Sequence, residues 1–106
     1  MCRLFGYVTE QERSAADLLG DEGLAAFTSL TAVHADGWGM AWHEHGRNVR
    51  TASSPRSAGQ DPTYDELART PLSRAGLVHL RWATGGLDVG PENTHPFFDQ
   101  HYALAH

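Results

Sequence analysis

The chain has 106 residues, 41% hydrophobic and 20% charged, which is the composition of one small globular domain. Its net charge of −5 excludes the basic surface that binds nucleic acid or an anionic membrane. The single cysteine excludes an internal disulfide, and the sequence contains no secretory signal and no apolar stretch of membrane-spanning length. The expected location is the cytoplasm.

The first predicted element is a strand over residues 4–8, LFGYV. Leu4 and Val8 alternate with Phe5 and Tyr7, so both faces of the strand are apolar. A strand of this kind is typical of a layered fold that covers the sheet on both sides. We therefore expect both faces to be buried.

Two short helices should follow. Ser14 and Asp17 have the spacing of a capping box that opens a helix over residues 14–19, and Gly20 should end it. Apolar residues recur at helical spacing over 23–30, which predicts the second helix.

The central part of the chain predicts a strand, a loop and a third helix. Residues 37–44 alternate bulky and small side chains, and the face of small residues should let another layer approach closely. The polar stretch 51–60, rich in Ser, Gly and Pro, is typical of a surface loop. Asp61 and Pro62 form a suitable N-cap and first position for a helix over 62–70.

The last part predicts a strand over 77–84, a loop over 85–93 and the start of a buried strand over 101–106. Apolar alternation in this last segment runs to the end of the sequence. Chain ends are usually exposed. We therefore expect residues 1–106 to be the N-terminal part of a longer domain.

Cys2 directly follows the initiator methionine. If Met1 is removed, the same residue carries a thiol nucleophile and a free α-amine that can act as its base. If Met1 stays, Cys2 is a small, weakly polar residue in a strand. Position alone leaves both interpretations open.

Three further stretches could carry chemistry: HADGWG at 34–39, HLRWATGG at 79–86 and NTHP at 93–96. Arg81 lies near a strand end, where its planar guanidinium could bind a carboxylate through two hydrogen bonds or could simply lie in water. Asp36 and Gly37 have the signature of a turn, and His95 could be a structural histidine.

Together with MCRLFGYV and HYALAH, these stretches resemble, in order and spacing, the class II glutamine amidotransferases. The similarity covers residues 2–106 and is greatest to the stand-alone branch that includes the γ-glutamyl hydrolase of ergothioneine biosynthesis. It implies an N-terminal-nucleophile hydrolase of the α+β class, a four-layer αββα sandwich with mainly antiparallel sheets. Residues 1–106 would be the N-terminal portion of that domain.

The resemblance also implies a role for each matching residue. Cys2 would attack glutamine or a γ-glutamyl amide, with its own α-amine as base, and form a γ-glutamyl thioester. Arg81 would bind the substrate's α-carboxylate. Trp82 and Thr84 would lie in the loop that closes over the substrate, and His95 would line or support the pocket. Asp36, Gly37 and Gly85 would have only a supporting part.

The sequence also departs from the family pattern. Gly85 stands where relatives often have histidine. The family's Asn-Gly oxyanion pair and its ammonium-binding acid would come after His106, so we expect residues 1–106 alone to be nearly inactive. The resemblance implies no cofactor and no metal. Ammonia from free glutamine could pass to a synthase partner, whereas a γ-glutamyl conjugate would indicate a stand-alone hydrolase.

Two alternatives belong to other classes. A non-catalytic binding or regulatory domain could keep the same scaffold, and a retained Met1 would favour it. A metal-binding module could use His43 and His45 with His34 and Asp36, although their spacing matches no known zinc pattern.

Overall fold

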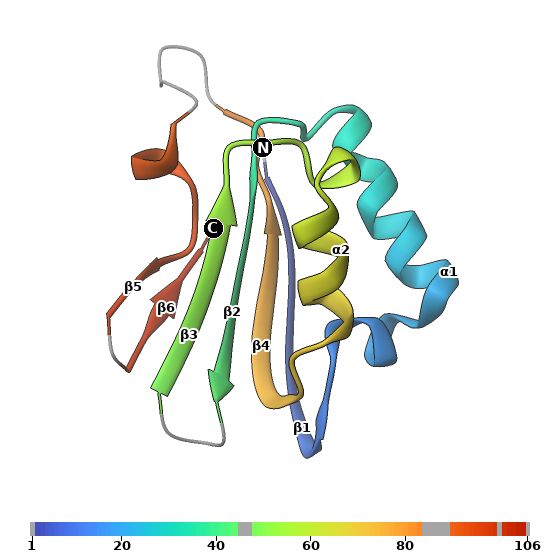
Figure 1. Cartoon of the computed structure of the whole chain (residues 1–106), viewed down its shortest axis with the longest axis vertical. Coiled ribbons are helices and arrows are strands. Elements are labelled where there is room, and N and C mark those ends of the chain that lie inside the picture. Colours follow the sequence, from blue (N-terminus) through green and yellow to red (C-terminus); the bar gives the residue numbers. More distant parts are fainter. Residues whose placement is uncertain (1, 45–47, 84–89, 100, 106) are drawn as a thin grey trace.

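The computed structural model describes residues 2–44, 48–83, 90–99 and 101–105. Two helices lie together on one side of a four-stranded antiparallel sheet, and a short hairpin lies on the left in Figure 1. The sheet has the order β1–β4–β2–β3, formed by Arg3–Arg13, Ser73–Leu80, Trp38–Glu44 and Asn48–Ser54. The hairpin pairs β5, Phe97–Phe98, with β6, Ala103–Leu104.

The helices begin where the sequence predicts. In α1, Ala15–Ser29, the Ser14 hydroxyl accepts a hydrogen bond from the Asp17 N–H, and the Asp17 carboxylate accepts one from the Ser14 N–H. Gly20, with φ +71°, interrupts α1 and divides it into the two expected helical segments. In α2, Pro62–Arg69, the Asp61 carboxylate caps the first turn through the Thr63 N–H.

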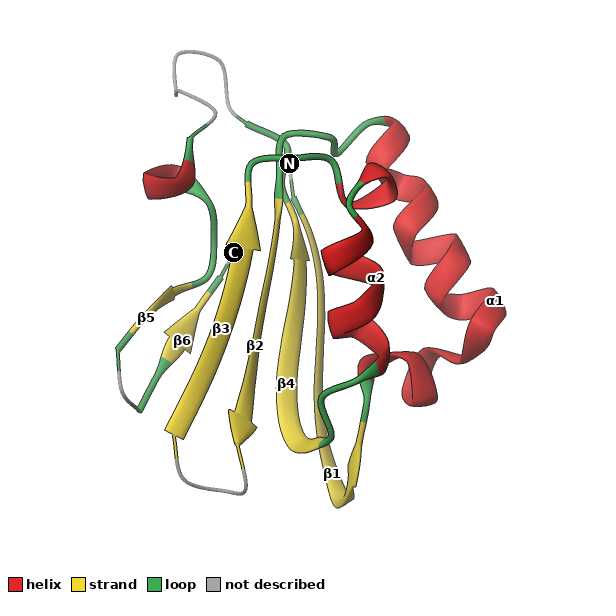
Figure 2. Ribbon diagram, in the orientation of Figure 1, coloured by secondary structure: helices red, strands yellow, loops and turns green. Residues whose placement is uncertain are grey.

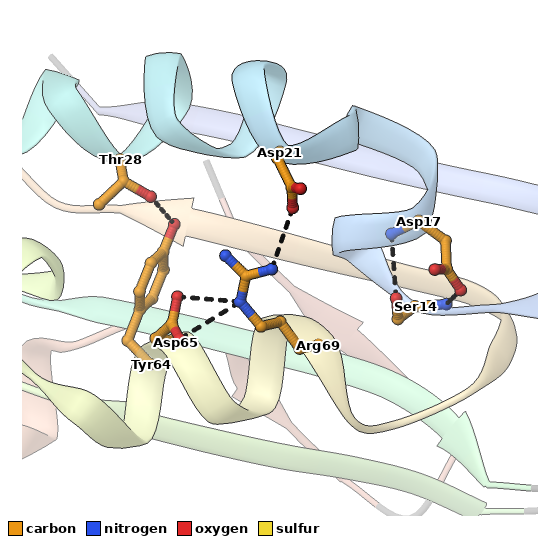
Figure 3. Close-up of polar contacts among 7 residues, drawn as sticks. All are labelled: Ser14, Asp17, Asp21, Thr28, Tyr64, Asp65 and Arg69. Atoms are coloured by element: carbon orange, nitrogen blue, oxygen red, sulfur yellow. Dashed lines mark hydrogen bonds and ion pairs between the residues drawn. The ribbon is translucent and has the colours of Figure 1, made fainter.

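Polar contacts hold the two helices side by side (Figure 3). The hydroxyls of Thr28 and Tyr64 are 3.1 Å apart, and Tyr64 is almost completely buried. Arg69 bridges the helices, since its guanidinium lies 3.2 Å from Asp21 on α1 and 3.2 Å from Asp65 on α2. The helical layer therefore packs as one unit.

The core lies between this layer and one face of the sheet (Figure 2). The bulky side chains of β2 face the helices, as the alternation over 37–44 predicts, and Trp38 and Met40 are buried there. Val78 and Leu80 of β4 complete the same apolar surface. The small-residue face of β2 lies on the opposite side.

The first prediction that fails concerns that opposite side. Leu4 is 51% exposed and Val8 is 86% exposed, so only the Phe5 and Tyr7 face of β1 packs in the core. The exposed face forms an open groove of about 440 Å³, whose lining includes Leu4, Val8, Ala41, Val49, Leu77 and Ala103. Because Ala103 belongs to β6, the hairpin covers only one border of this face.

Strand boundaries account for the other corrections. The expected loop over 51–60 begins only after Ser54, because β3 pairs with β2 along its full length from Asn48 to Ser54. The strand expected over 77–84 covers Ser73–Leu80, and its pairing with β1 and β2 ends at Leu80. The last strand is confined to Ala103–Leu104, and Leu104 is 65% exposed rather than buried.

The α+β class and the antiparallel pairing are confirmed. Within the described residues the structure contains one helical layer, the four-stranded sheet and the short β5–β6 sheet, which is part of the four-layer arrangement expected. No helix among these residues is long and apolar enough to cross a membrane.

Candidate active site

The ends of three neighbouring strands bring the candidate residues together. Arg3 of β1 and Trp38 of β2 both pair with Leu80 of β4. One register step beyond this row, Cys2 precedes β1 and Arg81 follows β4. Gly37 precedes β2 in the same position. In Figure 1 this end of the sheet lies beside the label N.

Backbone hydrogen bonds continue past the strand ends and fix the 34–37 loop against residues 81–83. The Arg81 N–H donates to the Gly37 carbonyl at 2.9 Å, and the Asp36 N–H donates to the Arg81 carbonyl at 3.1 Å. The Asp36 carboxylate then accepts a hydrogen bond from the Ala83 N–H at 2.7 Å. Two sequence motifs 47 positions apart thus form one structural unit.

The thiol of Cys2 lies against this unit. Its sulfur is 3.5 Å from the Trp82 backbone nitrogen and 3.8 Å from the Trp82 carbonyl oxygen. Sulfur is a weak donor and acceptor, so both contacts fit a thiol that is held by a peptide group. Cys2 is half-buried and is a free cysteine. The thiol is therefore fixed in direction and still accessible.

Arg81 and Trp82 differ in exposure. Arg81 is only 5% exposed, whereas Trp82 is 45% exposed. A buried guanidinium with a planar array of donors is suited to bind a carboxylate. Thr84, the other residue expected in the substrate-closing loop, and Gly85, expected to be a supporting residue, lie outside the described residues.

His95 lies over the sheet face opposite the helices. Its ring centroid is 4.7 Å from that of His79 and 4.6 Å from that of Phe97. His79 pairs in register with both Leu4 and Gly39, so His95 covers a row two steps along the strands from Cys2. The expected close approach to the small-residue face occurs here, since the His95 carbonyl lies directly against Gly39.

Gly37 is required by its backbone conformation. Its φ of +136° is rarely adopted by other residues, and a Cβ there would lie 2.8 Å from the Ser54 carbonyl oxygen. The next residue, Trp38, donates a 2.9 Å hydrogen bond from its indole to Asp61. Together these contacts fix the position where β2 begins and hence the loop before it.

Sequence reasoning gave His34 no role in this site. The structure buries His34 and places its ring edge-on to Trp82, with centroids 5.5 Å apart. The sequence signal that could have revealed His34 was its position two residues before Asp36, in the same short loop. Ala83 was also missed, because it contributes only a backbone N–H.

Comparison with known proteins identifies the family of the chain. Residues 1–106 match the family described as glutamine amidotransferases class-II. The chain belongs to this family. That family assignment confirms the resemblance found in the sequence, which rested on the stretches that the strands bring together.

Three relatives show how far the similarity extends. It is 32% identical to the "Putative glutamine amidotransferase" of Haemophilus influenzae, over 100% of this chain and 36% of that protein. It is 37% identical to the "Putative glutamine amidotransferase YafJ" of Escherichia coli, over 71% of this chain and 29% of that protein. It is 28% identical to the gamma-glutamyl-hercynylcysteine sulfoxide hydrolase of Mycolicibacterium smegmatis, over 100% of this chain and 50% of that protein. The chain therefore spans half or less of each relative.

The amidotransferase scaffold separates the residues of the metal-binding alternative. Asp36 precedes β2 and His43 lies near its far end, a separation of about 23 Å for an extended strand. His45 lies outside the described residues. Among the residues that are described, no group of three or more His, Cys, Asp or Glu side chains could hold a metal ion.

Proposed function

We propose that the protein is a cysteine-dependent amidohydrolase of glutamine or a γ-glutamyl amide, with Cys2 as the nucleophile. The observation that carries the proposal is the Cys2 sulfur, which lies 3.5 Å from the Trp82 N–H, directly after buried Arg81. Family membership supports amide chemistry of this kind. The relative named as a γ-glutamyl hydrolase supports the γ-glutamyl group as the part of the substrate recognised.

The first half of the reaction forms a thioester. Removal of Met1 gives Cys2 a free α-amine beside its thiol, and α-amines and thiols in general have similar reference pKa values, about 8 and about 8.5. The amine takes the thiol proton as the sulfur attacks the γ-carbonyl carbon. The tetrahedral intermediate then expels ammonia or an amine, which takes up that proton. The γ-glutamyl group remains on the sulfur.

The second half regenerates the thiol. Water attacks the thioester carbonyl, with the α-amine accepting its proton, and the C–S bond breaks. The thiolate is reprotonated and glutamate is released. A retained Met1 would block both halves, because the α-amine would then lie one residue away from the thiol.

Substrate recognition is assigned to the residues around Cys2. Arg81 binds the α-carboxylate through its guanidinium fork. Trp82 and Thr84 are assigned to the loop that closes over the substrate and His95 to the pocket, while Gly85 has a supporting part. Because a catalytic thiolate must stay reduced, the proposal fits a cytoplasmic protein.

The decisive test is an intact mass spectrum before and after treatment with a glutamine-like diazoketone. The thiol proton would pass to the diazo-bearing carbon, the Cys2 sulfur would bond to that carbon as the C–N bond breaks and dinitrogen leaves, and a stable thioether would remain. Because residues 1–106 alone are expected to be nearly inactive, the test uses the whole protein that contains them, and we expect it to lose Met1 and to gain one label, mapped to Cys2 by peptide analysis. The Cys2→Ser variant, which keeps a small polar side chain, should gain none.

A chain that keeps Met1 and takes no label would overturn the proposal and favour the non-catalytic scaffold. Protection from labelling then identifies the substrate. Free glutamine as the better protectant would indicate ammonia release, with a synthase partner as its recipient. A γ-glutamyl conjugate as the better protectant would indicate a stand-alone hydrolase.

A further inference from the structure

The segment that contacts the thiol is held mainly through its backbone. The Trp82 peptide N–H faces the Cys2 sulfur, and the residues on either side of Trp82 are both hydrogen-bonded to the 36–37 turn. On the N-terminal side, the bonds of Arg81 are backbone to backbone. On the C-terminal side, the bond of the Ala83 N–H goes to the Asp36 side chain.

We propose that Asp36 is a positioning residue, whose carboxylate holds the Ala83 N–H and thereby orients the Trp82–Ala83 peptide, whose carbonyl oxygen faces the Cys2 sulfur at 3.8 Å. This inference rests on the proposed function of Cys2 as a nucleophile. It gives a turn residue that touches neither the thiol nor a substrate a specific effect on the reaction. The contact is short, 2.7 Å, as hydrogen bonds to a carboxylate are.

Asp36 is itself firmly fixed. Its own N–H donates to the Arg81 carbonyl, and the next residue, Gly37, is confined between Ser54, Pro55 and Thr94. The Asp36 side chain is half-buried, so its carboxylate is partly shielded from water. A carboxylate on so rigid a base can transmit position to the peptide that it binds.

A second contact restricts the side chain of Trp82. The ring of buried His34, two positions before Asp36, lies edge-on to the Trp82 indole. Asp36 therefore controls the direction of the Trp82–Ala83 peptide, while His34 limits where the Trp82 ring can lie. The peptide group and the ring of Trp82 are both held by the 34–36 segment.

The loss expected without Asp36 is local. The Ala83 N–H would bind water, and the Trp82–Ala83 peptide, with its carbonyl oxygen, could then rotate away from the sulfur. The thiol would lose a fixed acceptor, whereas Arg81 would keep its backbone bonds to Asp36 and Gly37. Chemistry at the sulfur should therefore suffer more than binding of the substrate carboxylate.

The experiment measures kinact and KI for diazoketone labelling of Cys2 in Asp36→Ala, Asp36→Asn and Asp17→Ala. Asp17 is the matched control, since its carboxylate also accepts a backbone N–H but lies beyond the far end of β1 from Cys2. For Asp36→Ala we expect kinact to fall about tenfold or more with KI within about twofold. Asp36→Asn, which keeps an acceptor oxygen, should recover most of kinact, and Asp17→Ala should match the wild type.

Equal kinact in Asp36→Ala and wild type would overturn the inference, and so would an equal loss in Asp17→Ala. An Asp36→Asn variant as slow as Asp36→Ala would also overturn it, because the charge and not the hydrogen bond would then matter. Melting temperatures of all variants show which of them are folded.

Hydrogen exchange of the Trp82 and Ala83 amides separates this inference from the proposed function. If wild type takes no label, the proposed nucleophile fails, and the exchange result alone decides the positioning role. Exchange at both amides that is about tenfold faster in Asp36→Ala, but not in Asp36→Asn or Asp17→Ala, supports it. Unchanged exchange in Asp36→Ala overturns it.

Discussion

The indole nitrogen of Trp38 donates a hydrogen bond to the carboxylate of Asp61, 2.9 Å away. Trp38 is the first residue of β2, and Asp61 is the N-cap of α2. A single buried carboxylate thus joins the sheet to the helical layer at the end of the sheet where Cys2 lies. Its loss should affect both elements.

We expect Asp61→Ala to lower the free energy of unfolding by about 2–4 kcal/mol. An N-cap contributes about 1 kcal/mol, and a hydrogen bond to a charged group contributes about 1.5–3 kcal/mol. Urea unfolding measures this loss. The control is Asp65→Ala in the same helix, where the exposed ion pair with Arg69 should cost under about 1 kcal/mol. Equal losses in the two variants would contradict the special role of Asp61.

The same carboxylate predicts a pH dependence of stability. Burial raises the pKa of Asp61, but hydrogen bonds from Trp38 and Thr63 and the charge of Arg56 outweigh it and hold that pKa below its ordinary value. A lowered folded-state pKa stabilises the fold above the unfolded value of about 3.9, and this stabilisation disappears as the pH falls through the folded-state pKa.

The unfolding free energy of the wild type should therefore fall more steeply than that of Asp61→Asn between about pH 5 and about pH 2. The comparison isolates Asp61 from Asp99, whose pKa is also lowered, by the backbone N–H groups of His101 and Tyr102. Urea titrations at a series of pH values provide the measurement. Parallel curves for the two proteins would show that Asp61 does not contribute.

Substitution of Gly39 should have a steric effect on the segment that carries His95. A Cβ at Gly39 would overlap the His95 carbonyl, so Gly39→Ala must displace the segment around His95 or strain the sheet. We expect this to lower the free energy of unfolding by about 1–3 kcal/mol. Gly6→Ala on the same sheet face is the control, because its Cβ would lie 3.9 Å from the nearest atom. Thermal unfolding should show a clear loss in Gly39→Ala only. Equal stability in both variants would mean that the segment around His95 can move away without a loss of stability.

The helix starts could be predicted because each is set by residues close together in the chain. Ser14 and Asp17 are three positions apart, and Asp61 caps a turn that begins at the next residue. Such contacts form with little help from tertiary structure, so the sequence pattern suffices. The bulky face of β2 was also correct, since alternation in one strand decides which side is apolar.

The failures arise from contacts between distant residues. Polar β3 forms because β2 offers it a complete register of backbone partners, which its own side chains do not reveal. The exposed face of β1 is apolar in the sequence, yet pattern alone cannot say whether another layer covers it. At the site, the contact between Cys2 and Trp82 uses the backbone of Trp82, and a pattern of side chains carries no signal for it.

The last prediction separates substrate binding from chemistry. If Arg81 binds the α-carboxylate through its guanidinium fork, Arg81→Lys keeps the charge but loses the paired hydrogen bonds. We expect KI for the diazoketone to rise about tenfold or more, with kinact within about threefold. This is the reverse of the pattern expected for Asp36→Ala. Circular dichroism checks that the variant, which alters a residue only 5% exposed, stays folded.

A chemical control identifies the group that Arg81 binds. The methyl ester of the same diazoketone lacks the carboxylate, so the wild type should bind the ester about as weakly as Arg81→Lys binds the acid. Arg81→Lys should discriminate far less between acid and ester. If the variant loses the same factor against both compounds, Arg81 shapes the pocket without contacting the carboxylate, and the assignment of Arg81 as its binding residue is wrong.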